Sequence, residues 1–313
     1  MTHKIDLGGI ESAPRWILTF LGAYLAVDLL VLYLWNAAGQ AFPMQASGDS
    51  SPSLSVTAMA CVDLWLCLVV LRSFRAGAPL RPAWMLITLA AGSRAASGIF
   101  APLLGANWLL NPLVWSGHAD PGLLDAIRYA ALFTGGPVAL VLLAAAMLAG
   151  LRILRKYGFW ARPHAADWAL CAVVCLFVVC RFVEAGAASL AGRQIAAEDW
   201  IALAGLPVLC VLILEAALLR QSVARMGNGL ISQCWAAFMY GIFLTGFGEL
   251  ALWVVPHYTR TWPMATVESL LRCATAAVFA LAPACQVAAQ RRATKPAGSQ
   301  PADLATGVPA LAR

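Results

Sequence analysis

Residues 125–155 read DAIRYAALFTGGPVALVLLAAAMLAGLRILR, an apolar run with Arg128 near its start and a basic turn at its end. A helix needs about 20 mostly apolar residues to cross the roughly 30 Å hydrocarbon core of a bilayer. The part of this run over 125–151 meets that length. The sequence therefore predicts a membrane-spanning helix here, followed by a turn on the cytoplasmic side.

The composition of the whole chain agrees with a membrane protein. Of its 313 residues, 61% are hydrophobic and 12% are charged, whereas a soluble domain usually has about 25% charged residues. This balance excludes a soluble enzyme and a disordered protein. Basic residues mark cytoplasmic loops in such a chain, so the formal net charge of +6 indicates topology and no nucleic-acid partner.

Eight stretches are long and apolar enough to span a bilayer. They lie near residues 16–36, 55–72, 83–104, 125–151, 165–190, 200–220, 229–255 and 264–289. Arginine and lysine gather after the second, fourth and sixth stretches and in the C-terminal tail, which the positive-inside rule places in the cytoplasm. The sequence predicts an all-α polytopic transmembrane helix bundle of about eight spans, with both termini cytoplasmic, in a bacterial inner membrane.

The chain is expected to form a single transmembrane domain over residues 1–290. Residues 291–313 are rich in Ala, Pro, Gly and Thr, cannot bury a core, and are expected to be a disordered basic cytoplasmic tail. A weak internal repeat over spans 2–7 suggests three tandem hairpins, each with a basic turn and a Trp at the start of the rising helix. Basic turns and interfacial Trp also arise without duplication, so that alternative stays open.

Besides Glu215, which lies near the cytoplasmic end of its span, nine charged residues stand out in the middle and outer layers of the predicted spans. They are Asp28, Asp63, Arg94, Arg128, Arg181, Glu184, Glu249, Glu268 and Arg272. A charge at bilayer depth costs at least about 2.5 kcal/mol on insertion scales and needs a partner or water. We expect these residues to line a cavity in the outer half of the bundle, which binds a small polar or ionic ligand.

The alternative is that these charges pair with one another and lock the bundle. Arg181 and Glu184 are spaced i,i+3, and Glu268 and Arg272 are spaced i,i+4, so each pair could be satisfied on its own helix.

Motifs of the common membrane enzymes are missing from the sequence. The four histidines lie in loops or at helix edges, which argues against haem and di-iron centres. The nine cysteines lie within the spans without converging histidines, so we interpret them as small packing residues and not as metal ligands. No catalytic residue, metal or cofactor is predicted, although a lipid-modifying enzyme that uses Arg and Glu stays an alternative.

The last predicted hairpin combines a basic turn, Trp235 at the start of the rising helix, and Glu249 after a glycine farther along. This texture resembles the multi-helix membrane input modules that precede histidine kinase or diguanylate cyclase domains in bacterial sensor proteins. The resemblance covers about residues 55–255 and implies a sensing role. No segment is long enough for a kinase or cyclase domain, so any output is expected to pass through a separate protein.

Two hypotheses for function follow. The first is a non-enzymatic membrane sensor or accessory subunit, surrounded by membrane lipids, whose basic turns contact a cytoplasmic or membrane partner protein. The second is a transporter of an ion, proton-coupled or otherwise, or of a small polar solute. Transporters usually break helices near the midplane. The Gly135-Gly136-Pro137 run and Pro207 are expected near the outer helix ends, which disfavours transport, whereas Glu215 on the cytoplasmic side would extend a proton path and favours it.

Overall fold

The computed structural model describes most of the chain, and all the regular secondary structure in this part is helical. The described residues are 23, 26, 54–105, 121–159, 162–195, 197–226, 229–254 and 262–294. The expected all-α class is therefore confirmed over these ranges. The predicted first span at 16–36, with Asp28, lies outside the described residues apart from Ala23 and Ala26, and the tail beyond Thr294 lies outside them altogether.

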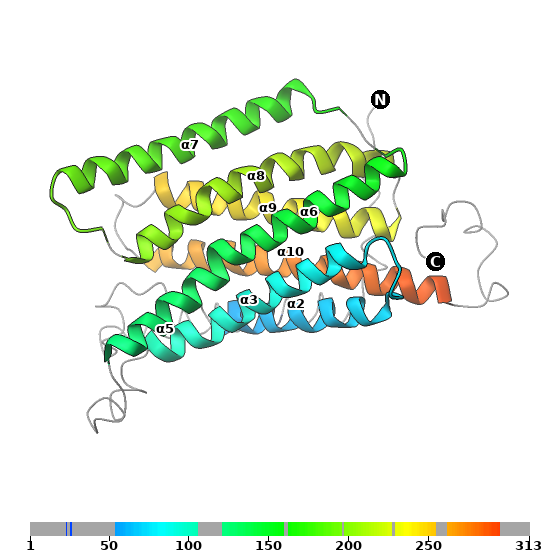
Figure 1. Cartoon of the computed structure of the whole chain (residues 1–313), viewed down its shortest axis with the longest axis horizontal. Helices are drawn as coiled ribbons and strands as arrows, with labels where there is room; N and C mark the ends of the chain where they lie inside the picture. Colours follow the sequence, from blue (N-terminus) through cyan, green and yellow to red (C-terminus); the bar gives the residue numbers. More distant parts are fainter. Residues whose placement is uncertain are drawn as a thin grey trace.

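The described elements are mostly long helices (Figure 1). They are α2 (Leu54–Ser73), α3 (Arg81–Gly105), α5 (Pro121–Phe133), η3 (Thr134–Val138), α6 (Ala139–Lys156), α7 (Ala165–Leu190), α8 (Ala197–Arg225), α9 (Leu230–Val254) and α10 (Trp262–Thr294). The η3 element is a short π-helix, and it joins α5 to α6 without a break in the rod.

Five helical segments are long and apolar enough to cross a membrane. They are Arg81–Phe100, Gly122–Lys156, Ala165–Leu190, Asp199–Val223 and Leu230–Ala251. Each coincides with one of the stretches expected from the sequence. These apolar helices are compatible with a multi-pass membrane protein, and α2 and α10 pack on each other and on the same bundle.

One end of the bundle, on the right in Figure 1, contains the C-terminal ends of α2, α6 and α8 and the N-terminal ends of α3, α7 and α9. The basic residues at this end are Arg72, Arg75, Arg81, Arg152, Arg155, Lys156, Arg162, Arg220 and Arg225. We call it the basic end. It is the end that the sequence predicts to be cytoplasmic.

The core of the bundle contains a chain of aromatic rings drawn from three helices. Phe238 of α9 packs against Trp84 of α3, Trp235 of its own helix and Phe279 of α10, with ring centroids 5.7, 6.1 and 6.4 Å apart. These distances and the tilted planes are typical of favourable aromatic pairs. Gly150 of α6 lies against the Trp235 ring, where an added Cβ would come within 2.5 Å of a ring carbon. Only glycine lets α6 approach α9 this closely.

The α2–α3 hairpin is antiparallel, and its register is set by two hydroxyl groups. The Thr57 hydroxyl donates to the carbonyl oxygen of Gly98 at 2.9 Å. Nearer the basic end, the Thr88 hydroxyl lies 3.5 Å from the carbonyl oxygen of Cys67 and also donates to its own helix. In both contacts a side chain of one helix reaches the backbone of the other, so the two helices lie close together. A shift of one helix along the other by one residue would break both contacts.

Helix α7 lies at the edge of the bundle (Figure 1). Only 11% of its spanning window is buried, against 50% for α8. It packs on α8 and scarcely on α6, so the second of the three hairpins suggested by the sequence is not a packed hairpin. Its large exposed side chains face the space that a bilayer would occupy.

Candidate intramembrane site

The α5–η3–α6 rod departs from regular α-helical geometry at a π-helical turn, Thr134–Val138. Pro137 lies inside the π-helical turn, where it cannot donate a backbone hydrogen bond. Gly135 of the same turn touches α3, since a Cβ there would lie 2.1 Å from the Cβ of Ser97 and 3.3 Å from the carbonyl oxygen of Ser93. Short π-helical turns are frequent at functional sites.

This contact corrects one expectation from the sequence. The glycine–proline segment was expected near an outer helix end, but it follows the full length of α5 and touches α3 about one turn from Arg94. It also faces α8, because a Cβ on Gly205 would lie 3.9 Å from the Pro137 ring. Pro207 is within a turn of that contact. The two proline-containing segments therefore meet inside the bundle.

Beside this π-helical turn, α2 and α3 contribute opposite charges. The hairpin register places Asp63 at the level of Arg94, and the two side chains interact electrostatically. The Cys67 thiol donates to an Asp63 carboxylate oxygen at 3.6 Å. The Arg94 guanidinium carbon lies 4.9 Å from the centroid of the Phe279 ring, within the range of a cation–π interaction.

The Asp63–Arg94 charge pair lies at the end of the aromatic chain, yet both side chains are only half-buried. The guanidinium can offer several N–H donors in a plane to an anionic group. The carboxylate can receive a cation or a proton. Together the two residues can therefore hold a small ligand that carries charge of either sign.

Two of the other predicted residues pair with each other. Arg181 donates to Glu184 at 2.8 Å, one turn apart on α7. Because α7 is at the edge of the bundle, this pair is separate from the Asp63–Arg94 charge pair in the core. The local pairing expected from the i,i+3 spacing is confirmed here.

The remaining predicted residues lie farther from the basic end or outside the described side chains. Gly241 of α9 faces Phe279 of α10, and this antiparallel register brings Glu249 to the level of Arg272. Glu249, Arg272 and Arg128 each interact with a neighbouring group. Asp28 and the side chain of Glu268 are outside the described part, so their membership in a shared cavity stays a prediction.

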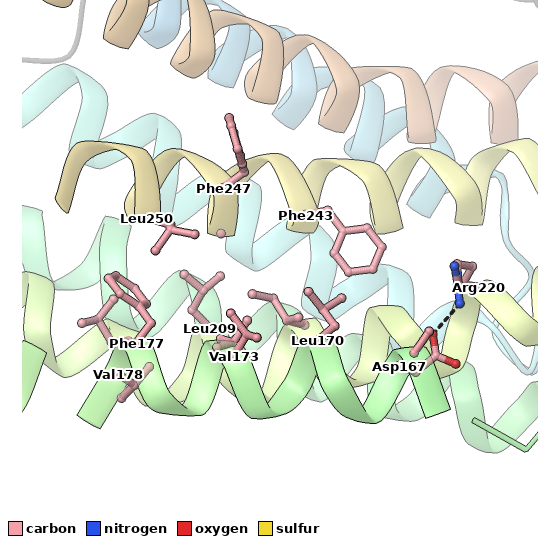
Figure 2. A pocket seen from close by; sticks show the side chains of 15 residues that line it. Asp167, Leu170, Val173, Phe177, Val178, Leu209, Arg220, Phe243, Phe247 and Leu250 are labelled. Carbon is pink, nitrogen blue, oxygen red and sulfur yellow. Dashed lines mark hydrogen bonds and ion pairs between the residues drawn. The ribbon is translucent and has the colours of Figure 1, made fainter. Parts of the chain in front are cut away.

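A cavity of about 360 Å³ lies between α7, α8 and α9. We call it the α7 slot. Its apolar wall includes Val173, Phe177, Leu209, Ile213, Phe243 and Leu250, and Asp167 and Arg220 lie at one end (Figure 2). None of the predicted site residues that the structure describes lines it.

The Asp167–Arg220 pair was missed by the sequence reasoning. Arg220 donates to Asp167 at 2.5 Å, and Gln221 donates to the same carboxylate at 3.1 Å. The backbone N–H of His164 also donates to Asp167, at 2.8 Å, which closes a capping box at the start of α7. The spacing His164-x-x-Asp167 before an apolar run was the available signal.

One acidic side chain has a buried oxygen atom for which the described residues supply no hydrogen bond. Glu215 of α8 is 7% exposed, and its Oε2 atom has no hydrogen-bond partner among the described residues. Buried polar atoms are nearly always hydrogen-bonded, so an exception of this kind asks for an explanation. The indole N–H of Trp84 is a second exception in the same core.

The helices and charges define the class of an apolar multi-helix protein suited to a membrane. Searches against protein-family models, curated proteins and solved structures match nothing.

Proposed function

We propose that the protein binds a small ionic ligand at the Asp63–Arg94 charge pair and acts as a multi-pass membrane sensor or accessory subunit in the bacterial inner membrane. The observation that carries the proposal is the meeting of these opposite charges inside the bundle, with part of each side chain still accessible. Charges at this depth are costly, and in membrane proteins they commonly mark ligand or ion sites.

The ligand would be bound by its charge. An anionic group suits Arg94, which is already held in place by the Phe279 ring. A cationic group or a proton suits Asp63, which is held by the Cys67 thiol. A compound that carries both charges, such as a free amino acid, would satisfy both residues. Any signal would be transmitted at the basic end, where a partner protein could bind the arginine-rich turns.

A binding assay tests this function. Purified protein in detergent is heated with each of the common amino acids and small carboxylates, and the unfolding temperature is recorded. A ligand that binds only the folded state raises this temperature. Asp63→Asn and Arg94→Gln should abolish the shift. Asp199→Asn and Arg193→Gln, at exposed positions, should preserve it. A shift that survives both core variants would rule out this site.

Transport is the second candidate, and two observations favour it. The π-helical turn and Pro207 are two irregular helical positions that meet inside the bundle, and transporters usually have Gly- or Pro-containing irregularities near their binding site. Glu215 provides a buried carboxyl group between that region and the basic end. An ion could thus pass from the charge pair to Glu215.

Proteoliposomes that enclose a pH-sensitive dye separate the two candidates. A gradient of a candidate ion or solute is imposed across the vesicle membrane. A proton-coupled transporter should then acidify the lumen. Glu215→Gln and Asp63→Asn should each stop this acidification. Asp199→Asn is the matched control, because it removes a carboxylate at an exposed position. Ligand binding without flux would support the sensor or accessory role and would exclude proton-coupled transport.

A further inference from the structure

The α7 slot has the shape and the apolar surroundings that a lipid-binding site needs. It opens between an edge helix and the bundle, and its wall is apolar except at one end (Figure 2). From Asp167 to Val178 it follows α7 for about 16 Å at 1.5 Å per residue. In a membrane-spanning bundle the space beside α7 is filled by lipid chains and not by water.

The polar end of the slot offers hydrogen-bond donors at the basic end. Arg220 uses one guanidinium nitrogen for Asp167, and 47% of its side chain remains exposed. A guanidinium has five N–H donors, so several remain for an oxygen-rich anion. The Asp167 carboxylate also accepts hydrogen bonds from the Gln221 side chain and from the backbone N–H of His164. Arg220 is therefore not its sole stabilising partner.

The surrounding charge favours a negative partner. Among the residues that the structure describes near the slot at this end, Arg162 and Arg225 add positive charge to that of Arg220, and Asp167 contributes a carboxylate. Basic pockets between transmembrane helices on the cytoplasmic side commonly bind anionic lipid headgroups.

We propose that the α7 slot holds one acyl chain of an anionic phospholipid, with its phosphate bound by Arg220. The chain packs between Val173 and Phe177 of α7 and Phe243 of α9, and it adds to the contact of a helix whose main described neighbour is α8. This site is independent of the Asp63–Arg94 charge pair, so it holds whether or not the proposed function does.

Native mass spectrometry of the full chain tests the proposal. The protein is purified in detergent with equal amounts of phosphatidylglycerol and phosphatidylcholine, and bound lipid is counted as collision energy rises. Wild-type protein should retain one phosphatidylglycerol after other lipids have left. Its preference over phosphatidylcholine should be about tenfold, as expected for one charge-assisted contact.

Two valines on α7 provide a matched pair of variants. Val173 and Val179 are each 56% exposed, but only Val173 lines the slot. Val173→Trp places a large ring in the cavity and should lower lipid retention about tenfold or more. Val179→Trp adds the same ring to the same helix and should retain the lipid as wild type does. Equal retention in the two variants would overturn the proposal.

The headgroup assignment has its own variant. Arg220→Gln should make retention of the two lipids equal, whereas Arg225→Gln, at the same end but outside the slot, should keep the preference for phosphatidylglycerol. Both variants are checked for an unchanged helical circular dichroism spectrum. A preference that survives Arg220→Gln would overturn the assignment. A dimer that is lost in Val173→Trp, with no lipid bound to wild type, would assign the slot to a second copy of this chain instead.

Discussion

The guanidinium of Arg94 lies 4.9 Å above the ring of Phe279. This contact joins α3 to α10, while the charge of Asp63 attracts the same guanidinium from α2. Three helices are therefore linked through one arginine. A charge held in this way stabilises the bundle only while its partners are present, because an isolated charge in a protein interior is strongly unfavourable.

Removing one member of the charge pair should destabilise the protein. Asp63→Asn keeps an oxygen acceptor for the Cys67 thiol but leaves Arg94 without its counter-charge. We expect a loss of about 2 kcal/mol in the free energy of unfolding, below the usual cost for a fully buried pair because both side chains are half-buried. Unfolding in mixed micelles at increasing SDS measures it. Asp199→Asn should change the free energy by less than about 0.5 kcal/mol.

The double variant Asp63→Leu with Arg94→Met tests whether the pair is needed for stability itself. Apolar residues of similar volume often replace a buried ion pair without loss, so most of the stability should return. Ligand binding should not return. If both stability and binding were restored, the charges would have no role in recognition.

The contact between Gly135 and Ser97 should tolerate no side chain. Gly135→Ala places a Cβ 2.1 Å from the Ser97 Cβ, so α3 or the π-helical turn must shift. We expect a loss of about 1–3 kcal/mol, as for other overpacked cores. Its neighbour Gly136 has nothing within 4 Å of the added Cβ. Gly136→Ala should therefore be neutral or slightly stabilising, because alanine favours a helix.

A second-site change provides the check on this reasoning. Ser97→Gly removes the Cβ that the new methyl group would meet, so it should recover part of the stability of Gly135→Ala. Thermal unfolding of the single and double variants gives the coupling between the two positions. Additive effects would mean that the two helices are not in contact at this point.

Much of the helical layout was predictable because the bilayer imposes a local length rule. The spans near α3 and α8 follow from apolar runs and from the basic turns that precede α3 and follow α8. The Arg181–Glu184 pair was also accessible, because one helix sets its geometry.

The sites between helices were not predictable in the same way. The meeting of Asp63 with Arg94 depends on the register that Thr57 and Thr88 set across two helices. Asp167 and Arg220 are 53 positions apart in the chain and meet only because α7 packs on α8. Hydropathy along one helix contains no information about either contact. The depth of the Gly135 turn was misjudged for the same reason, since α5 extends the helix beyond the apolar run.

The packing of α7 on α8 can be tested by a cross-link. The sulfur atoms of Cys175 and Cys210 lie 3.2 Å apart, so mild oxidation should join them by a disulfide after a small movement. In a variant that retains only these two cysteines, cleavage at Arg193 in the exposed connecting turn should leave the fragments together without reductant. A variant that retains only Cys180 and Cys210 should separate after the same treatment. If the fragments separated in both variants, α7 would not pack on α8 in this register.

Replacing Glu215 should impair function but should not destabilise the fold. Its Oε2 atom is buried without a described partner, so burial costs free energy that no hydrogen bond returns. Glu215→Leu should therefore raise the free energy of unfolding by about 1 kcal/mol. If an ion passes by way of this carboxyl group, the same variant should stop flux in proteoliposomes while the protein becomes more stable. Such a trade-off between activity and stability is common for functional groups that are unfavourable in the folded state. A destabilised Glu215→Leu variant would instead show that the carboxylate has a structural partner, and the proton path would lose its second step.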